Sequence, residues 1–256
     1  AGYSVHVFEA NSYAGGKLHA FSLGNFRFDG GPSLFTMPHY VTELFTLAGK
    51  NPNDYFEYEK AETACHYFWE DGTFIRAYAE TEKFAAEVEQ KLGVEAKVIT
   101  DYMAHAKNIY DHSGKIFLEK SLHKSSTWLS KETLISLLKI KQFDLTKSMH
   151  RANKIRLGED HLVQLFDRFA TYNGSNPYKA PGILNVIPWL EHGFGTFFPK
   201  GGMEQIPQSL FKLAKELGVT FHFSQKVDEI VLEKKRAIGI KTGGKLHKAD
   251  LVMSNM

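Results

Sequence analysis

The chain opens on a short apolar strand that ends in an acid. Residues 3–9 run through Val5 and Phe8 to Glu9. In a dinucleotide-binding βαβ unit, an acid at the end of the second strand accepts hydrogen bonds from ribose hydroxyls, about 20 residues after a Gly-rich phosphate turn. The acid is present, but the sequence contains no G-x-G-x-x-G. The pattern predicts an α/β nucleotide-binding domain that the sequence enters part-way.

The last residues predict a second truncation. Residues 249–253 are typical of a buried strand, and the sequence stops just after it, in a predicted loop at Ser254. Loss of an initiator Met before Ala1 is an alternative account of the start alone. Taken together, the two ends predict a fragment that lacks both ends of its domain.

The periodicity of the sequence changes twice, which predicts an interrupted domain. A helix over 38–49 that stops at Gly49 belongs with the first strand, and Asp71-Gly72 joins two aromatic-rich strands of a new hairpin. The predicted domains are 1–60 and 196–256, which form the nucleotide domain, and 61–195, an inserted domain of sheet plus helices. The predicted strands are 64–69, 73–78, 219–224, 227–233, 237–242 and 249–253, and the predicted helices are 81–92, 95–119, 130–142, 145–157, 160–172, 182–191 and 204–217.

Composition excludes several classes of function. A net charge of +2 is too small to indicate a nucleic-acid partner, and no run of about 18 apolar residues is present to span a bilayer. Cys65 is the single cysteine, which rules out an internal disulfide and fits a reducing compartment. The twelve histidines include no i, i+4 pair, so we expect no metal site. A cytoplasmic location is favoured over a secreted one.

Two glycine-rich stretches follow Glu9 and are candidates for binding a nucleotide. Gly15 and Gly16 permit a close backbone approach, and Lys17 adds a cation suited to a diphosphate. Their alternatives are a solvated strand-end acid at Glu9 and an ordinary surface lysine. The second stretch offers backbone amides free of side chains and a Ser able to cap the next segment, or is simply a tight turn; it comprises Asp29, Gly30, Gly31, Pro32 and Ser33.

At this point the sequence resembles a known family. The motifs Val7-Phe8-Glu9-Ala10-Asn11, Gly15-Gly16-Lys17, Phe26-Arg27-Phe28-Asp29-Gly30-Gly31-Pro32-Ser33, Pro199-Lys200-Gly201-Gly202-Met203 and Val252-Met253-Ser254-Asn255 occur in one order over nearly the whole chain. This series resembles the bacterial phytoene desaturase family of FAD-dependent carotenoid desaturases, nearest to its hydroxycarotenoid 3,4-desaturase branch.

The resemblance implies FAD extended across a Rossmann-like domain of the glutathione-reductase type. By it, Glu9 holds the AMP ribose, residues 15–17 line the cofactor, and residues 30–33 approach the flavin. Val227 matches the strand position whose backbone contacts adenine, although a routine core valine is the alternative. Because the Gly-rich turn and the family's C-terminal flavin segment are missing, we expect this fragment to be inactive and not to retain FAD.

The implied chemistry is the removal of two hydrogens from adjacent carbons of a carotenoid, one as hydride to the flavin and one as a proton. Asp167, Glu191 and His192 are candidate proton acceptors by sequence neighbourhood only, and a structural role is favoured for each. No catalytic residue is assigned.

A water-insoluble substrate suggests a membrane surface, and residues 130–154 resemble a basic amphipathic helix that lies on an anionic membrane. A plain core helix fits them equally well. We expect a peripheral protein on the inner face of the membrane. Related flavoproteins such as a retinoid saturase or an amine oxidase, or a non-catalytic lipid-binding module, are the alternatives. The residues behind the membrane interpretation are Lys131, Lys139, Lys141, Lys147, Arg151 and Lys154, beside Leu129, Leu134, Leu137, Leu138 and Ile140.

Overall fold

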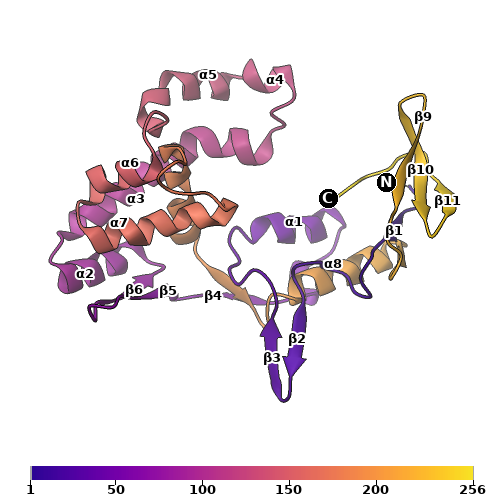
Figure 1. Ribbon diagram of the computed structural model, residues 1–256, viewed down its shortest axis with the longest axis horizontal. Coiled ribbons are helices and arrows are strands. Elements are labelled where there is room, and N and C mark those ends of the chain that lie inside the picture. The colour runs from indigo at the N-terminus through magenta and orange to yellow at the C-terminus, as the bar shows by residue number, and fades with distance from the viewer. Residues whose placement is uncertain (1, 256) are drawn as a thin grey trace. The chain divides into compact units, whose positions relative to one another are not determined.

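The chain forms two compact units in a computed structural model that describes residues 2–255 (Figure 1). The first unit comprises the described residues up to Glu59 and again from Phe198, and the second comprises Lys60–Phe197. The chain leaves the first unit in β4 (Tyr58–Lys60) and returns in β7 (Phe197–Pro199), and these two strands pair with each other.

The first unit is built around a parallel pair of strands. Strand β1 (His6–Phe8) pairs with β8 (Thr220–His222) in the register His6↔Thr220 and Phe8↔His222. Helix α8 (Gln205–Glu216) packs on this pair, with the rings of Phe211 and Phe221 4.6 Å apart. The remaining elements are the antiparallel hairpin of β2 (Ala20–Leu23) and β3 (Phe26–Asp29), helix α1 (His39–Leu47), a 3₁₀ turn at Pro52–Asp54, and the three-stranded sheet of β9 (Glu229–Glu233), β10 (Arg236–Thr242) and β11 (Lys245–Lys248) in the order β11-β10-β9.

The predicted strand over 249–253 is wrong. Gly243 and Gly244 both have positive φ and form a tight hairpin turn, so the residues just after them pair with β10. The last residue pair between β10 and β11 is Gly239↔Lys248, where β11 ends. Residues 251–255 form no strand. The strand predicted from 227 likewise begins only at Glu229, which leaves Val227 in the preceding loop.

The second unit is a hairpin covered by helices. The rings and branched chains of its core are almost fully buried, including Ile75 on the hairpin, Phe84 and Tyr102 on the first two helices, and Phe166 further along. Its elements are β5 (Thr63–Phe68), β6 (Phe74–Tyr78), α2 (Thr81–Leu92), α3 (Ala96–Gly114) with a π-helical turn at Lys115–Glu119, α4 (Ser125–Trp128), α5 (Lys131–Leu138), a 3₁₀ turn at Ile140–Phe143, α6 (Met149–Leu157), α7 (Asp160–Asp167), 3₁₀ turns at Arg168–Asn173 and Gly182–Val186, and a π-helical turn at Trp189–Gly193.

A single basic helix over 130–154 is not formed. Helix α5 ends at Leu138, Asp144 has a left-handed backbone with φ of 51°, and the Ser148 side chain caps a new helix by accepting from the Arg151 amide. The predicted α-helix over 182–191 is also wrong, because that segment forms 3₁₀ and π-helical turns instead.

Asp144 is the centre of a charged cluster that ties this break to the neighbouring helices. Its carboxylate accepts from His105 at 3.1 Å, Lys147 at 2.9 Å and Arg156 at 2.8 Å, and its side chain is only 4% exposed. Burial raises the pKa of Asp144, but the hydrogen bonds from Arg156 and Lys147 outweigh it and leave the pKa below its usual value. The cluster therefore keeps a buried carboxylate ionised.

Candidate functional site

Glu9 lies at the carboxyl end of β1, where ligands bind in parallel sheets. The Glu9 amide donates to the His222 carbonyl at 2.9 Å, and the Gln225 amide donates to the Glu9 carbonyl at the same distance. Its half-buried carboxylate accepts the Asn11 amide through Oε1 at 2.7 Å. The strand pairing and the loop after β8 thus hold Glu9 in a fixed position.

The turn at Gly15–Lys17 has backbone angles that side chains rarely adopt. Gly15 has φ of 113° and Gly16 has φ of 54°, and the Leu18 amide closes the turn by donating to the Gly15 carbonyl at 2.9 Å. A Cβ on Gly15 would lie 2.7 Å from Pro207 of α8, whereas one on Gly16 would meet nothing within 4 Å. Gly16 therefore presents an open stretch of backbone.

The second glycine stretch packs directly against the first. A Cβ on Gly31 would lie 1.8 Å from the Lys17 carbonyl oxygen, and one on Gly30 would lie 2.5 Å from His19 Nε2. The Gly30 amide also donates to the His19 carbonyl at 2.8 Å. The structure brings together two stretches that the sequence could only indicate separately.

A third glycine loop, residues 199–203, packs against Arg27 and Asp29 of the β2–β3 hairpin, next to the second glycine stretch. Asp29 Oδ2 accepts the Met203 amide at 3.2 Å, and Asp29 Oδ1 accepts Arg27 at 3.0 Å. A Cβ on Gly202 would lie 2.3 Å from the Arg27 guanidinium. The sequence analysis missed this role of Arg27, although Arg and Asp two residues apart on one strand point to the same face.

The remaining predicted residues lie at two positions in the first unit. Pro32 and Ser33 are exposed just after the packed glycines, but Ser33 does not cap α1, which begins at His39 without a side-chain cap. Val227 is half-buried, two residues after Gln225, whose amide bonds to the Glu9 backbone. Glu9 and the Val227 segment therefore lie together.

The residues present fit a nucleotide with hydroxyls and a phosphate. Among the described residues, the Glu9 carboxylate bonds only through Oε1, so Oε2 is open to a donor such as a ribose hydroxyl. His19 Nδ1 is buried between the glycine loops and has no partner within residues 2–255. Lys17 is exposed and free to meet an anion.

The whole chain, residues 1–256, matches the family model of the flavin-containing amine oxidoreductases. The chain belongs to this family. It is 48% identical over 255 residues to a 1-hydroxycarotenoid 3,4-desaturase of Flavobacterium sp. (strain P99-3), and 34% identical over 258 residues to a 4,4'-diapolycopene oxygenase of Methylomonas sp.. Both matches cover all of this chain, but 52% and 51% of those relatives, so the chain spans about half their length.

Solved structures show the same fold at low sequence identity. An oxidoreductase from Methanosarcina mazei superposes with a TM-score of 0.56 at 17% identity, over 98% of this chain and 52% of that one. A putrescine oxidase variant gives 0.57 at 14% identity, over 95% and 50%. The predicted fold class, a Rossmann-like FAD-binding fold with an interrupting domain, is confirmed, as are the flavin cofactor and the resemblance to carotenoid desaturases.

The three acidic and basic side chains considered as proton acceptors are held by contacts inside the second unit. Asp167 accepts His150 at 2.6 Å, and Glu191, only 1% exposed, accepts Arg168 at 3.2 Å. His192 donates from Nδ1 to the Tyr78 carbonyl at 3.1 Å, and burial lowers its pKa. These contacts hold all three side chains in place, but His192 Nε2 is buried with no hydrogen-bond partner among the described residues.

Within residues 2–255, no group of three or more metal-ligating side chains comes together. None of the helices described is both long and apolar enough to cross a bilayer.

Proposed function

We propose that this protein is an FAD-dependent desaturase that removes hydrogens from a carotenoid. The observation that carries the proposal is the 48% identity, over the full length of the chain, to a protein named a 1-hydroxycarotenoid 3,4-desaturase. The packing of the three glycine loops on one another, in the unit that also contains Glu9, supports it, because an extended dinucleotide needs closely approaching backbone along its length.

In this proposal different residues of the first unit bind different parts of FAD. Glu9 accepts the ribose hydroxyls through its open Oε2, and the backbone at Val227 contacts the adenine. Gly15, Gly16 and Lys17 follow the diphosphate. Gly30, Gly31, Pro32 and Ser33 present backbone to the flavin ring. All of these residues belong to the first compact unit.

FAD supplies the hydride acceptor for such a reaction. The contribution of this chain is to bind and orient it. The tight packing of Gly31 on Lys17 and the Asp29 link to Met203 fix the loops relative to one another, so the backbone donors are in place before any ligand arrives. The residue that accepts the substrate proton is not assigned.

The test is Glu9→Ala in a full-length protein that carries these residues, purified and reconstituted with FAD. Each lost hydrogen bond to a charged acceptor is worth roughly 1.5–3 kcal/mol, which corresponds to about 10- to 150-fold weaker FAD binding. Glu233→Ala, which removes an exposed acid of the same unit, is the matched control and should bind FAD normally. Equal flavin content in the Glu9 variant and the parent would refute the ribose assignment.

The substrate class needs a separate test, because the family also includes amine oxidases by its description. Under anaerobic conditions, a carotenoid carried in liposomes should bleach the protein-bound flavin absorption, and an amine such as putrescine should not. Bleaching by the amine alone would favour an amine oxidase. Failure of the full-length protein to bind any flavin would favour a non-catalytic lipid-binding module.

We also propose that the protein works at a membrane surface on the cytoplasmic side. Carotenoids are insoluble in water, so an enzyme that takes them up needs access to lipid. The support from this chain is an exposed apolar and basic segment in the second unit, whose exact location differs from the single helix predicted over 130–154.

A further inference from the structure

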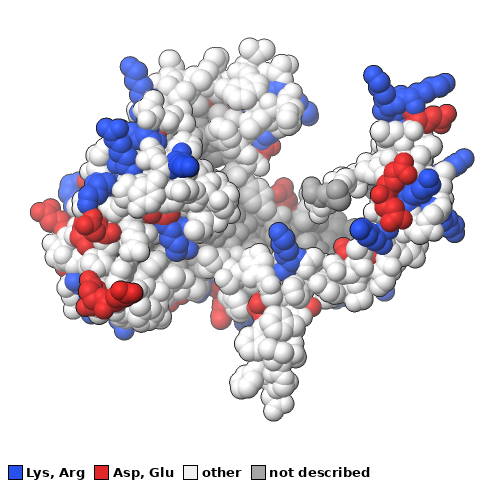
Figure 2. Space-filling view, in the orientation of Figure 1, with Lys and Arg blue, Asp and Glu red and all other residues white. Residues whose placement is uncertain are grey.

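Residues 116–145, here called the α4–α5 lobe, expose an unusual number of large apolar side chains. The two most exposed are Leu129 at 79% and Leu138 at 86%. In Figure 2 this part of the molecule, which carries the labels α4 and α5 in Figure 1, shows mainly white surface with few charged side chains. The exposed apolar residues of the lobe are Phe117, Leu118, Leu122, Trp128, Leu129, Leu134, Ile135, Leu137, Leu138, Ile140 and Leu145.

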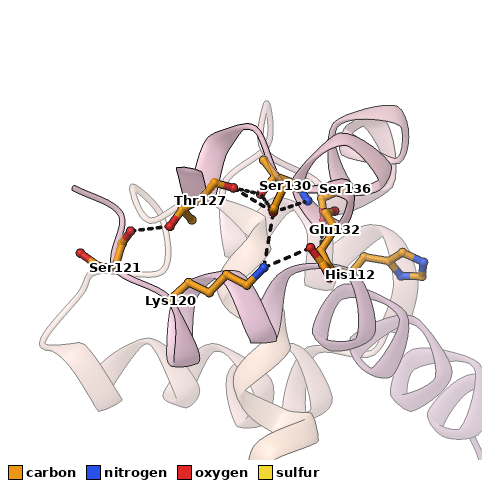
Figure 3. Close-up of polar contacts among 8 residues, drawn as sticks. His112, Lys120, Ser121, Thr127, Ser130, Glu132 and Ser136 are labelled. Carbon is orange, nitrogen blue, oxygen red and sulfur yellow. Dashed lines mark hydrogen bonds and ion pairs between the residues drawn. The ribbon is translucent and has the colours of Figure 1, made fainter. Parts of the chain in front are cut away.

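The buried side of helices α4 and α5 is polar, while Ile116 and Phe143 bury apolar side chains at the two ends of the lobe. Thr127, Thr133 and Ser136 are buried, and their hydroxyls donate to main-chain carbonyls. Thr133 Oγ1 lies 2.6 Å from the Thr127 carbonyl, and Thr127 Oγ1 lies 2.7 Å from that of Ser121 (Figure 3). Short helices on a water-soluble surface normally bury leucines and expose hydroxyls. Helices α4 and α5 have the reverse arrangement.

Specific polar contacts fix the lobe in this orientation. Lys120 reaches Glu132 at 3.1 Å and Ser130 at 3.4 Å (Figure 3). His112 Nδ1 lies 2.8 Å from a carbonyl and so carries the proton, which leaves Nε2 to accept from Lys139 at 2.6 Å. These contacts tie α5 to α3, so the leucines face outward in a defined structure.

The lobe also carries lysines with no internal partner. Lys124, Lys131 and Lys141 are exposed, and no ion pair or hydrogen bond of their ammonium groups occurs among the described residues. Lys139 and Lys147, which the sequence analysis grouped with them, are instead engaged by His112 and Asp144. The three free lysines therefore all lie in the lobe, and two of them, Lys131 and Lys141, belong to the basic set within residues 130–154.

We propose that the α4–α5 lobe is the membrane-docking element, inserting its leucines and Trp128 into a bilayer surface that contains anionic phospholipid. This deepens the proposed function, since it names the element that meets the membrane. Trp128 suits an interface because its indole donates to the Leu122 carbonyl at 2.9 Å while half of the side chain is exposed. Free lysines attract anionic headgroups and would repel a second copy of the same face.

The experiment is flotation of the purified protein with vesicles of phosphatidylcholine, with and without phosphatidylglycerol. Leu129→Ser with Leu138→Ser should weaken binding roughly a hundredfold, since each leucine contributes about tenfold or more on burial. Lys124→Gln, Lys131→Gln and Lys141→Gln together should remove the preference for phosphatidylglycerol. Matched controls in the first unit are Leu232→Ser for the leucines and Lys235→Gln, Lys245→Gln and Lys248→Gln for the charges.

Each outcome decides the proposal. Brominated lipid should quench Trp128 fluorescence, measured with Trp69 and Trp189 replaced by Phe. The proposal would be overturned if the leucine variants bound vesicles as tightly as the parent protein does. It would also be overturned if the parent protein were a dimer and the leucine variants were monomers. Circular dichroism of each variant shows whether it is folded, and Leu138→Ala provides a milder replacement. Because flotation requires no flavin, its failure would leave the FAD proposal standing.

Discussion

Replacing Gly31 with Ala tests the packing of the glycine loops. A Cβ at this position would lie 1.8 Å from the Lys17 carbonyl oxygen and 2.8 Å from its carbon, where real contacts essentially never fall below 3.0 Å. Both partners are backbone, so no flexible side chain can move aside. The two loops must therefore separate by roughly 1 Å or more, or the β2–β3 hairpin must shift with them.

The size of the effect follows from the nature of the contact. Overpacking typically destabilises a protein by about 1–3 kcal/mol, and a clash between two backbone segments belongs in the upper part of that range. For a chain of this size the melting temperature should fall by roughly 4–12 °C. If the loops hold the flavin as proposed, a displacement near 1 Å should also lower turnover by about a hundredfold.

The assay is thermal unfolding together with the flavin content of the purified protein after reconstitution. Gly24→Ala is the matched control in the turn of the same hairpin, where φ is 58° and a Cβ would meet nothing within 4 Å. It should lose about 1 kcal/mol from its left-handed backbone and keep its flavin. A Gly31→Ala protein with the parent's melting temperature and flavin content would refute the packing of Gly31 on Lys17.

Three further predictions concern the second unit. Asp144→Asn, which keeps a residue tolerant of the left-handed backbone but removes the charge that pairs with Lys147 and Arg156, should lower the free energy of unfolding by about 2 kcal/mol in urea titrations. Tyr102→Phe should lower it by about 1–3 kcal/mol, because its hydroxyl donates to buried Asn153 at 2.8 Å; no change would contradict that bond. Burial lowers the pKa of His105 and of His192, so on acidification the unfolded chain binds protons before the folded protein does, below about pH 6.5. The free energy of unfolding, measured by urea titration, should therefore fall by up to about 1.4 kcal/mol for each histidine between about pH 7.5 and about pH 5.5. A free energy of unfolding that stays constant over this range would contradict the prediction.

Local signals allowed much of the fold to be predicted from the sequence. Helix α2 spans Thr81–Leu92 as predicted, because Gly93 takes the left-handed conformation that ends a helix. The hairpin of β5 and β6 follows from Asp71-Gly72, where the Asp71 side chain accepts the Thr73 amide and Gly72 has φ of 87°. In both cases the deciding residues lie next to the element that they define.

The wrong strand prediction arose where hydrogen-bonded pairing with another strand, rather than local composition, determined the structure. Residues 249–253 have the composition of a strand, but the pairing with β10 goes to residues 245–248, which follow the Gly243-Gly244 turn. The sequence left open whether the segment around α5 faces a core or a surface, for a related reason. Its hydroxyls and leucines follow a helical period, and only the contacts of Lys120 and Ser136 determine which of the two sets faces inward.

The candidate site shows what a glycine in a sequence does and does not indicate. The sequence analysis assigned Gly31 to a close approach by a cofactor, and the structure shows that its missing Cβ is required by the Lys17 carbonyl. Gly16 differs, because its left-handed backbone faces open space and nothing within the described chain uses it. Gly31 therefore sets the distance between two loops, while Gly16 is free to meet a ligand. A substitution at Gly31 should disturb both folding and cofactor binding, whereas one at Gly16 should combine the modest strain of its positive φ with a disproportionate loss of FAD. If Gly16→Ala lost stability alone and kept its FAD, the backbone of this turn would have to be excluded from the cofactor site.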